Sequence, residues 1–456
     1  MIHVPTLVQN QRDFFNTHIT KNLNYRLDAL ENLHSSIQAH EEEILLALEQ
    51  DLGKGRVEAY TTEVGFVLNS ISYAIKHLET WAKPERVRTP IYQMGSTATV
   101  YYEPYGTTLI IGAYNYPFQL IMEPLLGAMA AGNTAIIKPS ELTPATAQII
   151  ETIINETFVS SYISVIQGDA AVVHGLLKQN FDFFFFTGSK RVGQLVAHAA
   201  IEQMAPYVLE LGGKSPVIVC RDADIQKAAK RIAWGKFLAA GQTCIAPDYI
   251  YVDETIKTQF VKALYAAIQK MYTIDPIDNP DYARIINDKH FTRIMNLVDP
   301  DKVILGGYYD REKRYIGPTI MDHITWDDPV MQEEIFGPLL PILTFREPSE
   351  VIRVLQDKDA PLATYVFTES EAVADRFMHG LQFGGGCVND VLAQVSNAQL
   401  PFGGIKASGS GRYHGFYSFE TFSHQKSIVD ASKKIEFDIQ YPPYRNKLGF
   451  IRKILK

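Results

Sequence analysis

Four continuous apolar segments between residues 107 and 189 constrain the possible fold of this chain most strongly. They read TTLIIGA, TAIIKPS, YISVIQG and FDFFFFTGS. Uninterrupted apolar runs of this length are typical of strands that are buried on both faces of a parallel sheet. Stretches compatible with helices separate them, so strand and helix alternate with short connections. This pattern predicts an α/β protein with a doubly wound parallel sheet.

Changes of pattern along the chain suggest its organisation. The first hundred residues look mostly helical, with Gly53 as a stop signal, and TVYYEPYG alternates like an exposed strand or arm. A second α/β pattern begins with YVLELGGKSPVIVC, and the last sixty residues are rich in Gly, Ser, Tyr and Lys. We expect a first domain at 1–210 with a bridging arm at 83–104, a second domain at 211–395, and a C-terminal segment at 396–456.

Composition argues against several classes of protein. Only three cysteines occur in 456 residues, and an odd number would leave one thiol unpaired in a secreted protein. The N-terminus lacks the basic and apolar regions of a secretory signal, so we expect a cytoplasmic protein. A net charge of −8 argues against nucleic acid as the main partner. No CxxC pair, HExxH helix or EF-hand loop supports a metal site.

The apolar stretch at 109–132 resembles a membrane span only in its length. Several of its residues would be costly in hydrocarbon, namely Asn115, Pro117, Gln119, Glu123 and Pro124. We therefore interpret it as a buried strand followed by a helix that starts near Pro117 and ends at Gly132.

Two segments at strand ends are candidates for binding a nucleotide. Gly188 and Gly193 in FFFFTGSKRVG stand where a strand turns into a helix, where backbone N–H groups can approach a pyrophosphate. An ordinary strand-to-helix turn is the alternative. Lys138 and Glu141 in IIKPSE follow a parallel strand at the edge where such sheets bind ligands. The alternative for this pair is a solvated ion pair that caps the next helix.

Cys244 in GQTCIAP is the candidate nucleophile. We expect a helix capped by Asp222 or Asp224 to stop at Gly241, which leaves Cys244 on the following loop. A reactive thiol needs partial exposure and electropositive surroundings. A loop position gives more exposure than we expect for Cys220 at a strand end or Cys387 within GGGCVND. Inert packing is the alternative for any of the three.

Two further polar residues complete a set that suits acyl chemistry. Glu210 in LELGGK ends a strand beside two glycines, where a carboxylate either works as a base or is held in an ion pair. Asn115 in AYNYPF follows another strand and either donates to a developing oxyanion or caps a helix. Nucleophile, base and oxyanion donor are the parts that acyl chemistry requires.

These segments together resemble the aldehyde dehydrogenase superfamily. LELGGKSP and GQTCIAP are similar to its two signature segments, with 34 residues from Glu210 to Cys244. EEIFGP at 333–338, then PFGG and SGSG within 401–411, follow in the family's order. AYNYPF without a tryptophan, SFETFSH and YPPY resemble the class 3 branch. The segment VNDVLAQVSNAQ before LPFGG departs from class 3, which leaves the substrate open.

The resemblance implies an enzyme that oxidises an aldehyde to a carboxylic acid with NAD(P)⁺. Cys244 would attack the aldehyde, Asn115 and the Cys244 N–H would hold the oxyanion, and Glu210 would activate water against a thioester. Residues 1–210 would then be the dinucleotide-binding domain and 211–395 the catalytic domain. The cofactor residues that carry over are Lys138 and Glu141 for the adenosine ribose, Gly188, Ser189 and Gly193 for the pyrophosphate, and Glu334 and Phe336 for the nicotinamide riboside.

The resemblance also sets expectations for cofactor, assembly and substrate. Glu141 favours NAD because a carboxylate disfavours a 2′-phosphate, although class 3 relatives often accept NADP. A homodimer is expected, with the arm near 89–104 and the C-terminal tail as exchanged strands. A medium-chain, long-chain or aromatic aldehyde is the expected substrate. The ending KLGFIRKILK is too short and too basic to span a bilayer, so no transmembrane anchor is expected.

Two other readings compete with this one. An acylating dehydrogenase would pass the acyl group of the thioester to coenzyme A. Such an enzyme would not need Glu210 as a base that activates water. A cysteine hydrolase or an idle binding protein is the other alternative. A hydrolase would need a histidine partner, which the matching loops lack, and an idle protein should have lost Cys244, Glu210 or Asn115.

Overall fold

The four apolar segments form adjacent strands of one sheet, as predicted. The computed structural model describes residues 4–273, 275–436 and 438–455. The sheet has the strand order β17-β7-β6-β3-β4-β5, and all but β17 are parallel. Its strands are β3 (Thr107–Ile111), β4 (Thr134–Lys138), β5 (Ile163–Val165), β6 (Phe183–Thr187), β7 (Tyr207–Glu210) and β17 (Gly409–Ser410).

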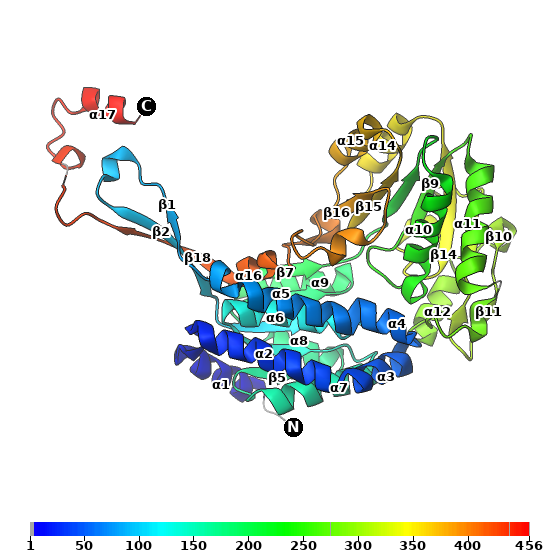
Figure 1. Cartoon of the computed structure of the whole chain (residues 1–456), viewed down its shortest axis with the longest axis horizontal. Coiled ribbons are helices and arrows are strands. Elements are labelled where there is room, and N and C mark those ends of the chain that lie inside the picture. Colours follow the sequence, from blue (N-terminus) through cyan, green and yellow to red (C-terminus); the bar gives the residue numbers. More distant parts are fainter. Residues whose placement is uncertain (1–3, 274, 437, 456) are drawn as a thin grey trace.

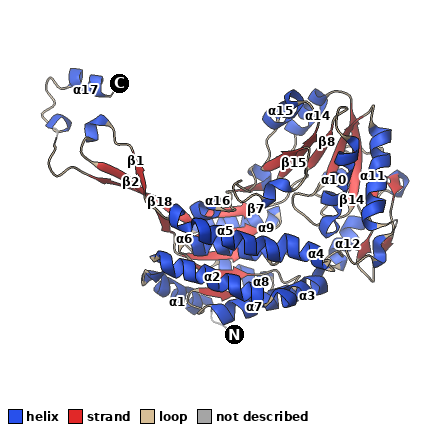
Figure 2. Ribbon diagram, viewed as in Figure 1, coloured by secondary structure: helices blue, strands red, loops and turns tan. Residues whose placement is uncertain are grey.

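Side chains alternate between two hydrophobic cores on opposite faces of this sheet. Ile110 and Phe185 enter one core, whereas Leu109 and Phe184 enter the other. The second core also contains residues of α1 (Val4–Asn16), α8 (Ala170–Leu177) and α9 (Lys190–Glu202). Helices on the opposite face are α2 (Leu23–Ala39), α3 (Glu41–Leu52), α5 (Gly65–Trp81), α6 (Gln119–Ala131) and α7 (Pro144–Thr157). Figure 2 shows this layered arrangement of helices and strands.

The strand order reverses at β3, which places a ligand-binding crevice at a defined edge. From β3 the chain proceeds to β4 and β5, then returns to β6 and β7 on the other side of β3. Open parallel sheets bind ligands at the carboxyl ends of the strands beside such a reversal. Asn115 follows β3 and Gly188 follows β6, so both lie next to this point.

A second sheet follows, and the chain enters it through residues 211–215. Its order is β10-β13-β14-β9-β8-β15-β16, parallel except for the β10–β13 pair. The strands are β8 (Pro216–Val219), β9 (Tyr249–Asp253), β10 (Val303–Leu305), β13 (Thr319–Met321), β14 (Leu339–Phe345), β15 (Ala363–Phe367) and β16 (Gly385–Val388). The accompanying helices are α10 (Ile225–Phe237), α11 (Lys257–Tyr272), α12 (Asp288–Met295), α13 (Pro329–Gln332), α14 (Pro348–Gln356) and α15 (Glu371–Gly380). A small hairpin joins β11 (Tyr309–Asp310) to β12 (Tyr315–Ile316).

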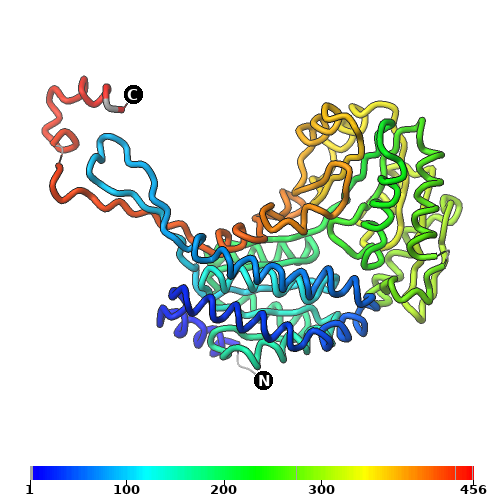
Figure 3. The backbone as a smooth tube through the Cα atoms, viewed as in Figure 1, coloured from blue at the N-terminus to red at the C-terminus, as the bar shows by residue number. Residues whose placement is uncertain are grey.

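An antiparallel arm projects from the first sheet, as Figure 1 shows. It consists of β1 (Glu85–Val87), β2 (Thr97–Pro104) and β18 (Ser423–Asp430). Strand β18 pairs with β2 of the same chain from Ser423 opposite Pro104 to Asp430 opposite Thr97. Figure 3 shows β18 running along β2 in the arm, with the chain continuing toward α17 (Leu448–Ile454).

The remaining short helices are α4 (Arg56–Ala59) and α16 (Phe416–Thr421). Within the described residues, the structure contains no helix long and apolar enough to cross a membrane.

Two predicted helices differ from the structure at their ends. The helix predicted from Pro117 begins at Gln119, while its end is correct because Gly132 adopts φ 97° as the cap. The helix predicted to stop at Gly241 ends at Phe237, and a 3₁₀ turn, Leu238–Gly241, follows. Between the two caps that the sequence left open, Asp224 is the one used, since it accepts from the Lys227 N–H at 3.1 Å.

Candidate active site

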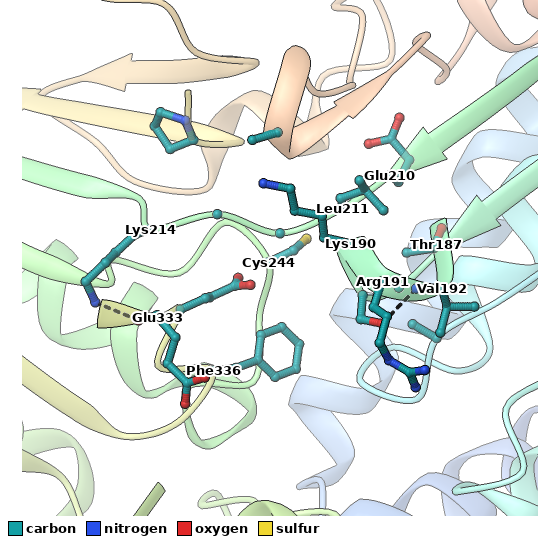
Figure 4. A pocket seen from close by; sticks show the side chains of 18 of the residues that line it. Thr187, Lys190, Arg191, Val192, Glu210, Leu211, Lys214, Cys244, Glu333 and Phe336 are labelled. Carbon is teal, nitrogen blue, oxygen red and sulfur yellow. Dashed lines mark hydrogen bonds between the residues drawn. The ribbon is translucent and has the colours of Figure 1, made fainter. Parts of the chain in front are cut away.

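One cavity of about 950 Å³ brings together nearly all the residues singled out in the sequence. It lies between the carboxyl edge of the first sheet and loops of the second sheet. Figure 4 shows Glu210 at the end of its strand, with Cys244 and Phe336 on neighbouring loops. The predicted residues that line the cavity are Asn115, Lys138, Glu141, Gly188, Ser189, Glu210, Cys244, Glu334 and Phe336.

Gly193 is the exception among the predicted residues. It lies inside α9 and is buried, and it is absent from the cavity lining. A Cβ at this position would lie 2.8 Å from Leu211 Cδ2. Its small size therefore lets α9 pack closely against the segment that follows Glu210, which is a structural role.

Cys244 lies on the loop after the 3₁₀ turn and is half-buried. Burial raises the pKa of its thiol, and the nearby carboxylates of Glu334 and Glu210 raise it further. The backbone N–H groups of Cys244 and Ile245 act in the opposite direction. The charged groups that affect the thiol are therefore carboxylates, not the electropositive surroundings that a reactive thiol requires. The exposure argument holds only against Cys220, which is buried, since Cys387 is half-buried like Cys244.

Glu210 is the last residue of β7 and is 2% exposed. Neither carboxylate oxygen has a hydrogen-bond partner among the described residues. The ion-pair alternative is therefore excluded for the described part of the chain. Burial raises the pKa of this carboxyl well above its usual value. A buried titratable group without a partner in a cavity is typical of functional sites.

Asn115 lies in the loop after β3, and it is buried. The helix that follows starts at Gln119 with Phe118 as its N-cap residue, so the capping alternative is wrong. Because β3 and β7 end at the same edge of the sheet, Asn115 and Glu210 approach the cavity from one side. Its side-chain amide is a donor of the kind that holds an oxyanion.

Glu334 approaches the glycine pair that follows Glu210 and Leu211. Its carboxylate accepts from the Gly213 N–H, and burial raises its pKa to about 8, with Asp248 adding to the effect. A Cβ at Gly212 would lie 1.9 Å from Glu334 Oε2. A side chain at position 212 would therefore displace the Glu334 carboxylate from its present position. The Phe336 ring faces Tyr114 edge-on, with 5.9 Å between the ring centroids.

The other end of the cavity has features that fit a dinucleotide. Lys138 ends β4 with only 1% of its surface exposed, and its Nζ donates to Glu141 Oε2 at 2.5 Å. The solvated-pair alternative is wrong for the lysine, which is a buried cation. Gly188 and Ser189 form the turn between β6 and α9, where Ser189 is the N-cap residue. A helix start beside a buried cation, at the strand reversal, is a suitable place for phosphate groups.

Sequence reasoning missed two basic residues in this part of the cavity. Lys190 and Arg191 occupy the first turn of α9 and line the cavity. Cations in a first turn oppose the helix dipole. Lys190 Nζ donates to Asp359 Oδ2 at 3.0 Å, so Arg191 is the residue whose placement favours a bound anion. That unfavourable placement, directly after Gly188 and Ser189 in the sequence, was the signal that could have identified them.

The arrangement provides a thiol, an unpartnered carboxyl and a side-chain amide around one space. An aldehyde in that space could be attacked by sulfur, its oxygen held by donors, and a resulting thioester hydrolysed by activated water. The remainder of the same cavity is lined by Lys138, Glu141, Gly188 and Ser189, which the family resemblance assigned to a dinucleotide. Within the described ranges, no group of three or more His, Cys, Asp or Glu side chains is arranged to hold a metal ion.

Comparisons with known proteins agree with this arrangement. A model described as the aldehyde dehydrogenase family matches residues 3–428. The chain is 48% identical to 4,4′-diaponeurosporen-aldehyde dehydrogenase of Staphylococcus aureus, over 98% of each chain. It is 41% identical to the mouse dimeric NADP-preferring aldehyde dehydrogenase, over 98% of this chain and 99% of that protein.

Solved structures give the same result. The substrate-bound state of Staphylococcus aureus AldH superposes with a TM-score of 0.98 at 47% identity and covers all of both chains. An indole-3-acetaldehyde dehydrogenase with NAD⁺ superposes with a TM-score of 0.85 at 26% identity, over 93% of this chain and 88% of that one. The chain therefore belongs to the aldehyde dehydrogenase family, whose members oxidise aldehydes to acids with NAD(P)⁺.

Proposed function

We propose that this aldehyde dehydrogenase works through a covalent intermediate on Cys244. The thiolate adds to the aldehyde carbon, and the carbonyl oxygen becomes an oxyanion held by the Asn115 amide and the Cys244 N–H. Loss of hydride from that carbon leaves a thioester on the sulfur. When bound, the nicotinamide accepts this hydride. The cofactor would be held by Lys138, Glu141, Gly188 and Ser189 at one end and by Glu334 and Phe336 at the other.

Glu210 completes the reaction in this proposal. Its carboxylate removes a proton from water, the resulting oxygen nucleophile attacks the thioester carbonyl, and the carbon–sulfur bond breaks to return the Cys244 thiolate. Aldehyde, water and NAD(P)⁺ thus give carboxylic acid, NAD(P)H and a proton. A raised pKa suits this role, because the carboxylate is then basic enough to accept a proton near neutral pH.

The observation that carries the proposal is the buried, unpartnered Glu210 in one cavity with Cys244 and Asn115. A glutamate held in an ion pair at this place would have a lower pKa and would be a weaker base. The acylating alternative would leave this costly group unused, and the hydrolase alternative would leave the long cavity beside Gly188 and Lys138 unexplained.

The substrate that we propose is a medium-chain, long-chain or aromatic aldehyde. The Staphylococcus aureus relative is named for the aldehyde of a diaponeurosporene, and this name supports a long apolar substrate. We also propose a cytoplasmic homodimer in which the projecting arm contacts the second subunit. The mouse relative is named dimeric. Three free cysteines suit a reducing compartment.

The first experiment measures reduction of NAD and NADP side by side over aldehydes of increasing chain length plus one aromatic aldehyde. We expect Cys244→Ala to lower turnover at least about 10⁴-fold, because Cys244 is the only cysteine among the residues that line the cavity. Cys387→Ala is the matched control, since that thiol is also half-buried, and it should retain turnover. Turnover that survives in Cys244→Ala would exclude the covalent mechanism. Reduction that requires coenzyme A would instead support the acylating reading.

A further inference from the structure

A buried hydrogen bond connects the two loops that carry Asn115 and Cys244. The Tyr116 hydroxyl and Thr243 Oγ1 lie 2.6 Å apart, and both side chains are buried. Tyr116 directly follows Asn115, and Thr243 directly precedes Cys244. Neither residue lines the described cavity.

The chain just before Cys244 is held in a strained conformation. Ala239 and Ala240 have φ values of 49° and 51°, which alanine rarely adopts. The Ala239 N–H donates to Glu58 Oε1 at 3.0 Å, and Ala239 packs with Tyr116 and Leu120 in a small cluster of their own. Such strain persists only where the surroundings determine the conformation, and it is concentrated at functional sites.

The same N-terminal segment that supplies Glu58 also supports Tyr116. Lys54 Nζ lies 3.9 Å from the centre of the Tyr116 ring and forms a buried ion pair with Glu63. The other oxygen of Glu63 accepts from the Phe118 N–H at 2.9 Å and from the Gln119 N–H at 3.2 Å. Residues 54–63 therefore hold the start of α6 on one side and the turn before Cys244 on the other.

From these contacts we infer that Tyr116, Thr243 and the Lys54–Glu63 pair form a positioning device, here called the brace, which sets the distance between the Asn115 amide and the Cys244 sulfur. The inference rests on the proposed roles of those two residues. The Tyr116–Thr243 bond is the only side-chain hydrogen bond between the two loops in the described part of the chain. A shift of about 1 Å in such a geometry can slow a reaction about 100-fold.

Isosteric variants test the brace without opening a cavity. Tyr116→Phe and Thr243→Val each remove one side of the bond, and Thr243→Ser keeps the hydroxyl. We expect each of the first two to slow hydride formation in the first turnover about 10- to 100-fold. Because they break the same bond, the double variant should be no more than about twofold slower than the slower single variant. Thr243→Ser should stay within about threefold of the wild-type rate.

Binding and stability measurements separate positioning from a general structural role. The dissociation constants for NAD and NADP should stay within about twofold, because the brace lies outside the cavity. Tyr282→Phe is the matched control: the buried Tyr282 hydroxyl donates to the Ile316 carbonyl at 2.9 Å, so one comparable hydrogen bond is lost. Its midpoint of thermal unfolding should fall about as much as that of Tyr116→Phe, but its first-turnover rate should not change.

The outcomes that overturn the brace are distinct. Three results would each contradict the inference. The effects of Tyr116→Phe and Thr243→Val on the first-turnover rate could multiply in the double variant. Thr243→Ser or Tyr282→Phe could also slow that rate as much as Tyr116→Phe does. Asn115→Ala and Cys244→Ala are measured in parallel to keep the two proposals apart. If they lose activity while the brace variants retain it, the brace alone fails. If Cys244→Ala retains activity, the proposed function fails.

Discussion

The two walls of the cavity hold buried carboxyl groups in different ways. Glu210, at the end of β7 in the first sheet, has no partner for either oxygen in the described residues. Glu334, on a loop before β14 of the second sheet, accepts from the Gly213 N–H and lies near the cations of Lys214 and Arg293. Burial raises the pKa of both, but donor and cations limit the rise at Glu334 to about 8. A carboxylate fixed by a hydrogen bond, such as Glu334, suits ligand binding. A carboxylate without a partner, such as Glu210, suits proton transfer.

The largest effect that tests this difference comes from two matched substitutions, Glu210→Gln and Glu334→Gln. We expect Glu210→Gln to lower steady-state turnover about 100-fold or more, because a general base typically contributes that much. The first turnover should still release a burst of reduced cofactor, since in the proposed mechanism hydride leaves before water attacks. Glu334→Gln should slow the first turnover itself and abolish the burst. Rapid-mixing absorbance of the reduced cofactor distinguishes the two.

Absence of a burst in Glu210→Gln would remove Glu210 from the hydrolysis step. A burst in both variants would show that Glu210 and Glu334 do not differ in the step at which they act. Glu312→Gln is the control substitution, since Glu312 occupies an exposed turn between β11 and β12 away from the cavity.

The sequence predicted the first sheet well because its information is local. Strands such as β3 and β6 are continuous apolar runs, and caps such as Gly132 and Asp224 are chosen by neighbouring atoms. The pairing of β18 with β2 joins residues over three hundred positions apart. Nothing local in either strand specifies its partner, so this pairing could not be predicted from the sequence.

The same limit applies to the site. Residue types and spacing identified Cys244, Glu210 and Asn115 as candidates, but their electrostatic surroundings depend on distant segments. The carboxylate that raises the pKa of Cys244 could not be foreseen, because Glu334 comes ninety residues later in the sequence. The brace is also invisible in the sequence, because Lys54, in the loop after α3, and Glu63, in the helical turn after α4, lie more than fifty residues before Tyr116.

A second test compares how strongly each carboxylate affects the thiol. Only the thiolate reacts, so the rate of Cys244 alkylation by iodoacetamide should rise with pH, and a raised pKa moves that rise to higher pH. Removing a neighbouring negative charge should lower the pKa and move the rise to lower pH. We expect a shift of about one pH unit in Glu334→Gln and a smaller one in Glu210→Gln, because Glu334 is the larger charge effect.

Mass spectrometry of the alkylated peptides separates Cys244 from Cys387, which serves as the internal control. Equal shifts in the two variants would show that both walls act alike on the sulfur. A shift to higher pH in Glu334→Gln would show that the thiol is not affected by that carboxylate as a like charge.

The last test concerns stability, and it follows from the missing partner of Glu210. Its pKa is raised in the folded protein, so between the ordinary carboxyl pKa and the folded value the unfolded chain is ionised while the folded protein keeps the proton. Raising the pH through that window therefore stabilises the unfolded chain, by about 1.4 kcal/mol per pH unit. Glu210→Gln abolishes this dependence. The free energy of unfolding of Glu210→Gln minus that of the wild type, measured by urea titration, should increase from pH 5 to pH 7. The same difference for Glu312→Gln should not change with pH. A decrease in the first difference as pH rises would mean that a partner stabilises the Glu210 carboxylate, and the contrast between the two walls would disappear.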